Sequence, residues 1–166
     1  MSEPSLTHVR ADGTAHMVDV SAKAVTPRTA SAAGRVLLSA EAVSALRSGN
    51  VPKGDALAVA RLAGIQGAKR TPELIPLAHP IGIHGIEVDL EVADDGVDVR
   101  AQVRTADRTG IEMEALTAVT VASLALIDMV KAVDRHARIT DVRVTAKAGG
   151  RSGDWAEDPS AEERDR

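Results

Sequence analysis

The chain has 166 residues, a length that predicts one domain. Its formal charge of −4 means that it lacks the overall positive charge that nucleic-acid binding needs. Aromatic residues make up 1% of the chain, with Trp155 and neither Phe nor Tyr, which argues against a protein that stacks single-stranded bases. The absence of cysteine excludes disulfides and thiolate metal sites.

The first predicted feature is an extended N-terminal arm. The first thirty-odd residues are polar, rich in Ala and Thr, and show no hydrophobic period. Within them, the segment AHMVDVSAKAVTPR at 15–28 would form the arm, with Asp19, Lys23 and Arg28 as its charged residues. A short strand follows at 35–38. Ser39 is a suitable N-cap for a helix that runs to about Arg47, and Gly49 closes that helix.

A second helix is predicted from about Lys53 to Arg70, with a stripe of small residues that predicts close packing against a neighbouring backbone. Thr71 would cap one short helical turn. Alternating apolar and charged residues at 86–92 and 97–104, separated by Asp-Asp-Gly, predict a β-hairpin.

Thr109 and Glu112 have the spacing of a capping box, which predicts the start of a long helix that continues to about Asp134. A last strand is predicted at 142–147. We expect residues 1–155 to form a single catalytic domain with an extended arm, and the charged tail at 156–166 to be disordered.

In chain order these elements are β-α-α-β-β-α-β. This order predicts an α+β fold of the ferredoxin-like, split βαβ type, in which an antiparallel sheet carries its helices on one face. The apolar residues are almost wholly aliphatic, and such a core buries less area per residue than an aromatic one. We therefore expect additional burial between subunits of a homo-oligomer.

The N-terminus, Met-Ser-Glu-Pro-Ser, lacks the pattern of a signal peptide, and we expect no apolar run of membrane-spanning length. The sequence therefore predicts a cytoplasmic protein without a membrane partner. The usual glycine-rich nucleotide motifs are missing, so scattered cations or backbone amides would have to hold any phosphate.

Two candidate residues lie in loops. Lys53, where a loop meets a helix, is suited to binding a phosphate, although a solvated surface lysine would have the same pattern. His79 precedes Pro80, which keeps it out of helical conformation and favours a role in proton transfer or ring binding over a structural one. His84 is nearby, but no carboxylate lies at a useful spacing, so we expect no metal site.

Glu112, Met113 and Glu114 fall in the first turn of the long helix, where acidic residues also suit the helix dipole. Glu114 could accept two parallel N–H groups from a guanine-like base. At the other end of this helix, Asp128 and Lys131 are spaced to pair. The pair is either an ordinary surface ion pair or, since an apolar stretch precedes it, a functional pair at the end of a buried face.

The segment Lys-Ala-Gly-Gly-Arg-Ser-Gly at 147–153 predicts either a flexible exit from the last strand or an anion site, with Lys147 adding charge. Glu114 and Asp128 are fourteen residues apart, about 21 Å along a straight helix. A small substrate cannot touch both in one subunit, so a site that uses both would be assembled across two subunits.

Seven motifs occur in order between Leu6 and Trp155: AHMVDVSAKA, KGD, AGIQ…AKRT, LIPL…HP, EMEALTA, DM…KAV and AK.GG.SGD. Together they resemble the cyclic pyranopterin monophosphate synthase family, the molybdenum cofactor biosynthesis protein C family. The resemblance implies a ferredoxin-like hexamer, a trimer of dimers, with active sites at subunit interfaces. It implies a lyase that needs no cofactor.

The implied reaction converts (8S)-3′,8-cyclo-7,8-dihydroguanosine 5′-triphosphate to cyclic pyranopterin monophosphate and releases pyrophosphate. The resemblance implies that Asp128, Lys53 and Lys131 are catalytic. It implies that the substrate-binding positions are Leu77, Ala78, His79, Met113 and Glu114. Arg28 and Lys147 are further cations for the triphosphate. The family often has Cys where this chain has Ala78, which favours backbone or shape contacts there.

Two other classes of function stay open from the sequence. A nucleotide-binding sensor on the same scaffold could lose the Asp128–Lys131 pair, which is intact here. A metal-dependent phosphohydrolase would need a cluster of His and carboxylate residues that the sequence does not show.

Overall fold

The computed structural model describes residues 8–10, 12–151 and 153–158. Over these residues the elements in chain order are β1 (Thr26–Leu37), α1 (Ala40–Ser48), α2 (Ala56–Lys69), α3 (Thr71–Leu74), β2 (Gly85–Val92), β3 (Gly96–Asp107), α4 (Glu112–Val130), β4 (Arg138–Ala148) and β5 (Trp155–Ala156).

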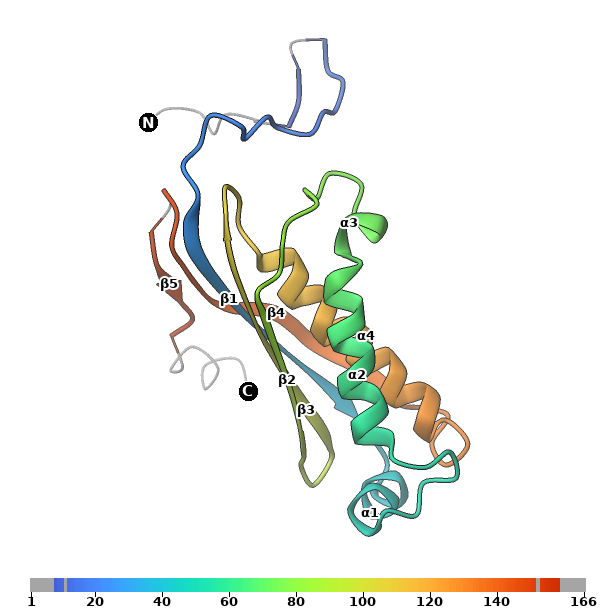
Figure 1. Cartoon of the computed structure of the whole chain (residues 1–166). Coiled ribbons are helices and arrows are strands. Elements are labelled where there is room, and N and C mark those ends of the chain that lie inside the picture. Colours follow the sequence, from blue (N-terminus) through green and yellow to red (C-terminus); the bar gives the residue numbers. More distant parts are fainter. Residues whose placement is uncertain (1–7, 11, 152, 159–166) are drawn as a thin grey trace.

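The strands form one antiparallel sheet in the order β2-β3-β1-β4-β5, and α2 and α4 lie side by side over one face of it (Figure 1). Strand β3 lies between β1 and β2, which are joined through α1 and α2. This is the split βαβ arrangement. The predicted α+β, ferredoxin-like fold is confirmed, and β5 adds a short edge strand that the sequence analysis did not include.

Strand β1 is much longer than the predicted strand at 35–38, so the prediction that this strand begins at Arg35 was wrong, and the last residues of the predicted arm belong to β1. Ala30 and Ala32 are buried in the core, and β1 pairs with β3 on one side and β4 on the other. Gly34 lets α4 approach, since a Cβ there would lie 2.8 Å from Val119 Cγ1. Its small residues made β1 resemble a loop in the sequence.

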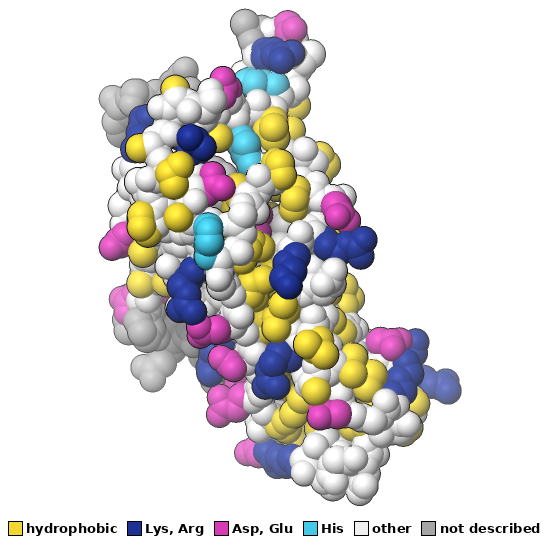
Figure 2. Space-filling model, in the orientation of Figure 1, with side chains coloured by type: hydrophobic (Ala, Val, Ile, Leu, Met, Phe, Trp, Pro, Cys, Tyr) yellow, Lys and Arg dark blue, Asp and Glu magenta, His cyan; other side chains and the backbone are white. Residues whose placement is uncertain are grey.

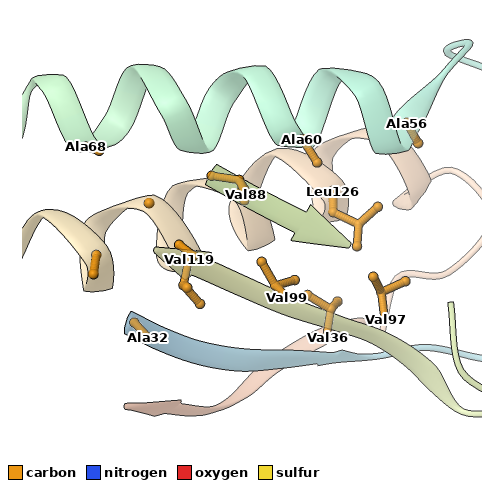
Figure 3. Packing of buried hydrophobic residues seen from close by; sticks show 14 of the residues in the cluster. Ala32, Val36, Ala56, Ala60, Ala68, Val88, Val97, Val99, Val119 and Leu126 are labelled. Carbon is orange, nitrogen blue, oxygen red and sulfur yellow. The ribbon is translucent and has the colours of Figure 1, made fainter. Parts of the chain in front are cut away.

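The predicted stripe of small residues on α2 packs against α4. A Cβ added at Gly64 would lie 2.8 Å from the Ala118 carbonyl oxygen, and one at Gly67 would lie 2.8 Å from Val121 Cβ. The small residues therefore bring the two helices close together. Figure 3 shows Val119 and Leu126 of α4 among the side chains of the core between helices and sheet.

Ser39 and Gly49 bound α1 as predicted: Ser39 Oγ accepts a hydrogen bond from the Ala42 amide at 3.3 Å, and Gly49 has a φ of 70°. Helix α2 begins three residues later than expected. Its N-cap is Asp55, whose carboxylate accepts from the Ala58 amide at 3.0 Å. Lys53 consequently lies in the loop before the helix.

The capping box of Thr109 and Glu112 is not formed. The N-cap of α4 is Ile111, which makes no side-chain cap hydrogen bond and is 1% exposed. Burial of this apolar residue, not a cap, positions the start of the helix. Thr71 was also wrongly predicted as a cap: it is the first residue of α3, and its hydroxyl donates to the Ala68 carbonyl at 3.0 Å.

The ends of the last two predicted elements also differ. Helix α4 ends at Val130 and not near Asp134, and β4 begins at Arg138, four residues before the predicted strand. Of the tail predicted at 156–166, Ala156 lies in β5, and Glu157 pairs with Arg143 at 2.8 Å. Residues 159–166 lie outside the described part of the chain.

Helix α4 has 19 residues and a mean hydropathy of 1.7, so it is long and apolar enough to cross a membrane by those two criteria. The expectation that no such run exists was therefore wrong. More than half of this stretch is buried, and it packs against α2, β1, β3 and β4. These contacts are those of the core helix of a globular fold.

Candidate active site

The three residues that the family resemblance implies are catalytic form one cluster at the end of α4. Lys53 Nζ donates to Asp128 Oδ2 at 2.6 Å, and Lys131 Nζ contacts Asp128 Oδ1 at 2.8 Å. We call Lys53, Asp128 and Lys131 the lysine–aspartate cluster. The hydrogen bond from Lys131, followed by the one from Lys53, lowers the pKa of Asp128 to about 2.

Local structure explains the cluster. Val51 is buried and anchors the loop between α1 and α2, and Gly54, at a φ of 96°, turns the chain towards α2. The i,i+3 spacing places Lys131 beside Asp128 on one side of α4. The three side chains are 40–59% exposed, so the pair lies at the end of the buried stretch of α4 but is not itself buried.

A cavity of about 360 Å³ lies near the start of α4. Its walls come from the N-terminal arm, the loop after α3 and the first turn of α4. All five residues predicted to bind substrate line it: Leu77, Ala78, His79, Met113 and Glu114. One protomer therefore brings together two segments that are more than thirty positions apart.

Glu114 is the buried acid of this cavity, with 3% of its surface exposed. Burial raises the pKa of Glu114 to about 7, and the neighbouring charge of Glu112 adds to the shift. The raised pKa places its titration close to neutral pH, which suits a group that exchanges a proton or accepts N–H donors from a ligand.

His79 connects the cavity to the N-terminal arm, because its Nε2 lies 2.7 Å from the Val18 carbonyl oxygen and donates to it. Arg108 Nε donates to the Lys23 carbonyl at 3.0 Å. Lys23 also lines the cavity. The sequence pattern did not predict that the arm forms a wall of the site, although charged residues in a segment without hydrophobic period were a possible signal.

The two remaining predicted cations lie on neighbouring strands. Lys147 Nζ is 3.5 Å from Glu112 Oε1, beside the cavity. Arg28 Nε donates to the Asp107 carbonyl at 3.0 Å, and its guanidinium lies against Gly150. The predicted anion loop is partly used within the chain, since the Gly149 amide donates to Asp154 at 2.9 Å.

The cavity and the lysine–aspartate cluster lie at opposite ends of α4. Glu114 is in its first turn and Asp128 near its end, about 21 Å apart by helical rise. A larger hollow of about 980 Å³ lies on the sheet face away from the helices, but none of the predicted site residues lines it. Among the described residues, no three His, Asp or Glu side chains gather as a metal site.

The chain is similar to proteins of known family. The family model described as MoaC family matches residues 17–150. A protein of Streptomyces avermitilis is 63% identical over 93% of this chain and 91% of its own length. One of Streptomyces coelicolor is 65% identical over 90% and 88%, and one of Corynebacterium efficiens 61% over 94% and 99%. All three are named cyclic pyranopterin monophosphate synthase.

Proposed function

The chain belongs to the MoaC family, as its motifs predicted, and we propose that it is a cyclic pyranopterin monophosphate synthase of molybdenum cofactor biosynthesis. It acts as a lyase that converts (8S)-3′,8-cyclo-7,8-dihydroguanosine 5′-triphosphate to cyclic pyranopterin monophosphate and releases pyrophosphate. The observation that carries the proposal is the cavity that gathers all five predicted substrate-binding residues around the buried Glu114.

The proposed cavity holds the ring system of the substrate. The Glu114 carboxylate accepts the N–H groups of the guanine-derived ring, and these donors favour its charged form on binding. His79 is held by the arm through Nε2 and presents the rest of its ring to the cavity. Leu77 and Met113 supply apolar contacts, and Ala78 supplies shape where the family often has Cys.

The lysine–aspartate cluster handles the phosphate end and the proton transfers. Two ammonium groups on one carboxylate present positive charge to a triphosphate, while Asp128 fixes their direction. Ring opening and re-closure need a general acid and base, and Lys53 and Lys131 are the proposed groups. Lys147, which contacts Glu112 of the cavity wall, and Arg28 are further cations for the triphosphate.

We further propose a homo-oligomer in which each active site is built from two subunits. The distance between Glu114 and Asp128 along α4 supports this. If α4 of a second copy ran antiparallel to α4 of the first, Asp128 of one copy would lie near Glu114 of the other. Helices α2 and α4 carry exposed apolar side chains, among them Leu62, Val59 and Leu124. Figure 2 shows hydrophobic side chains, in yellow, along the helices on this face of the molecule. The family resemblance implies a hexamer, a trimer of such dimers, and we propose that it works in the cytoplasm.

The direct test is incubation of the purified chain with the cyclo-nucleotide while pyrophosphate release is measured. We expect pyrophosphate and a pterin product in equal amounts. Tight binding of the nucleotide without any pyrophosphate would contradict the proposal and identify a nucleotide-binding sensor. Protein with Asp128→Asn is the matched control, since it keeps the size of the side chain but lacks the anion between the lysines.

A further inference from the structure

Asp134 is a buried carboxylate outside the two groups of site residues. It is 6% exposed and lies just after α4. Its Oδ2 accepts a hydrogen bond from the Ser39 amide at 2.7 Å, and its Oδ1 accepts one from the His136 amide at 2.8 Å. Each oxygen therefore binds a backbone N–H from a different segment.

The bond to Ser39 connects parts of the chain that are 95 positions apart. Ser39 is the N-cap of α1, and α1 leads directly into the loop that carries Lys53. On the other side, Asp134 follows the turn of α4 that carries Asp128 and Lys131. Both segments that supply the lysine–aspartate cluster are thus tied to each other through Asp134, at the lower end of the helices in Figure 1.

Helix α1 does not need Asp134 for its own cap. The Ser39 hydroxyl already accepts from the Ala42 amide, within the helix's own first turn. Asp134 instead takes the Ser39 N–H, which precedes the helix and points towards the end of α4. The bond from Ser39 is the main reason that the pKa of Asp134 lies below its usual range, so the carboxylate is charged at neutral pH and both N–H groups stay paired.

We propose that Asp134 is a positioning residue for the lysine–aspartate cluster. By holding the start of α1 against the end of α4, it fixes the Lys53 loop at the distance from Asp128 that the 2.6 Å contact requires. The catalytic part of this inference rests on the proposed function, whereas the geometric part does not. A shift of about 1 Å in a catalytic group is enough to cost a large factor in rate.

The test follows the Asp128 carboxyl by carbon-13 NMR titration of the full chain without substrate. In the unaltered protein this group titrates near 2, because both lysines hold it charged. Asp134→Asn loses one of the two acceptors. We expect its Asp128 titration to move towards the ordinary value of 3.8, and kcat for pyrophosphate release to fall roughly 10- to 100-fold.

A second pair of variants changes Ser39, the donor of the same hydrogen bond. This pair keeps the proposal testable if Asp134→Asn does not fold. Ser39→Pro removes the amide that Asp134 binds, and the φ of −66° at this position suits proline. Ser39→Ala keeps that amide and removes only the hydroxyl cap. We expect Ser39→Pro to shift the Asp128 titration as Asp134→Asn does, and Ser39→Ala to leave it in place.

The proposal is overturned if Asp134→Asn folds with the Asp128 titration unchanged, or if Ser39→Ala shifts it as far as Ser39→Pro. Failure of the proposed function would look different. The unaltered chain would then release no pyrophosphate from the cyclo-nucleotide, while the NMR comparison among the three variants would still decide whether Asp134 positions the cluster.

Discussion

Lys53 Nζ donates to Asp128 Oδ2 at 2.6 Å, although the two residues are 75 positions apart. Lys131 contacts the other oxygen of the same carboxylate at 2.8 Å. A single anion therefore holds two ammonium groups near each other at the surface. Because all three side chains are well exposed to water, this arrangement adds little to the stability of the fold, and its main consequence is chemical.

Two replacements of Lys131 distinguish the contribution of its positive charge from its role in proton transfer. Lys131→Ala should cost about 0 to 1 kcal/mol of unfolding free energy, as exposed ion pairs do, yet lose roughly 10²- to 10⁴-fold in turnover. Lys131→Arg keeps the positive charge but cannot release a proton near neutral pH. It should bind a substrate analogue while turning over poorly. Pyrophosphate release, thermal unfolding and analogue binding measure the three effects separately.

The matched control is Lys69→Ala, an exposed lysine in the last turn of α2, which should leave all three measurements unchanged. Near-normal turnover in Lys131→Arg would contradict the acid–base role. In that case Lys131 would be a phosphate-binding group, and the proton transfers would belong to Lys53 or His79.

The pH dependence of stability should report on Glu114. Its pKa is about 7 in the folded chain and 4.5 when unperturbed, so between these values the folded state binds more protons than the unfolded state. The free energy of unfolding should therefore fall as pH rises from about 4.5 to 7, by at most roughly 3 kcal/mol. Glu114→Gln cannot ionise and should lose this part of the slope.

Denaturant unfolding at pH 5 and pH 8 measures this slope. Glu41→Gln, at an exposed position in the first turn of α1, is the control and should behave as the unaltered protein does. A Glu114→Gln variant that keeps the full difference between the two pH values would show that another group is responsible.

The hairpin and the main helices could be predicted because each has a clear period. The strand residues of β2 and β3 alternate between apolar and charged, and α4 is bounded by polar segments. Strand β1 was missed because Ala30, Ala32 and Gly34 are small and lack such contrast. Their burial depends on α4 and on two neighbouring strands, which no local pattern shows.

The site was predictable only in parts. Motif resemblance identified the residues at each end of α4, and the rise of a regular helix predicted the separation of Glu114 from Asp128. The contact of Lys53 with Asp128 depends on how the loop before α2 packs against α4. The role of the arm depends on hydrogen bonds to the Val18 and Lys23 carbonyls. Since every residue type has a main-chain carbonyl, these acceptors could not be predicted from the sequence.

The reaction should need no metal bound by the protein. This prediction comes from the absence of cysteine and from the lack of a carboxylate at a useful spacing from the pair His79 and His84 in the sequence. Turnover should survive exhaustive chelation followed by removal of the chelator, with magnesium supplied only as the counter-ion of the triphosphate. Lost activity that one particular transition metal restores, and magnesium does not, would contradict it.

A mixing experiment should reveal whether each active site is built from two subunits. Glu114→Gln damages the cavity end of α4 and Asp128→Asn the cluster end, so each variant alone should turn over poorly. In a mixed oligomer, a site that takes its cavity from one copy and its cluster from another can be intact in both halves. When the two variants are unfolded together and refolded, about a quarter of the sites should regain activity, because random pairing supplies both intact halves with that frequency.

The control is a double variant that carries both changes in one chain, refolded with the unaltered protein, and sedimentation measures whether mixed oligomers form. If mixed oligomers form and activity stays at the level of the single variants, both halves of the site must come from the same copy.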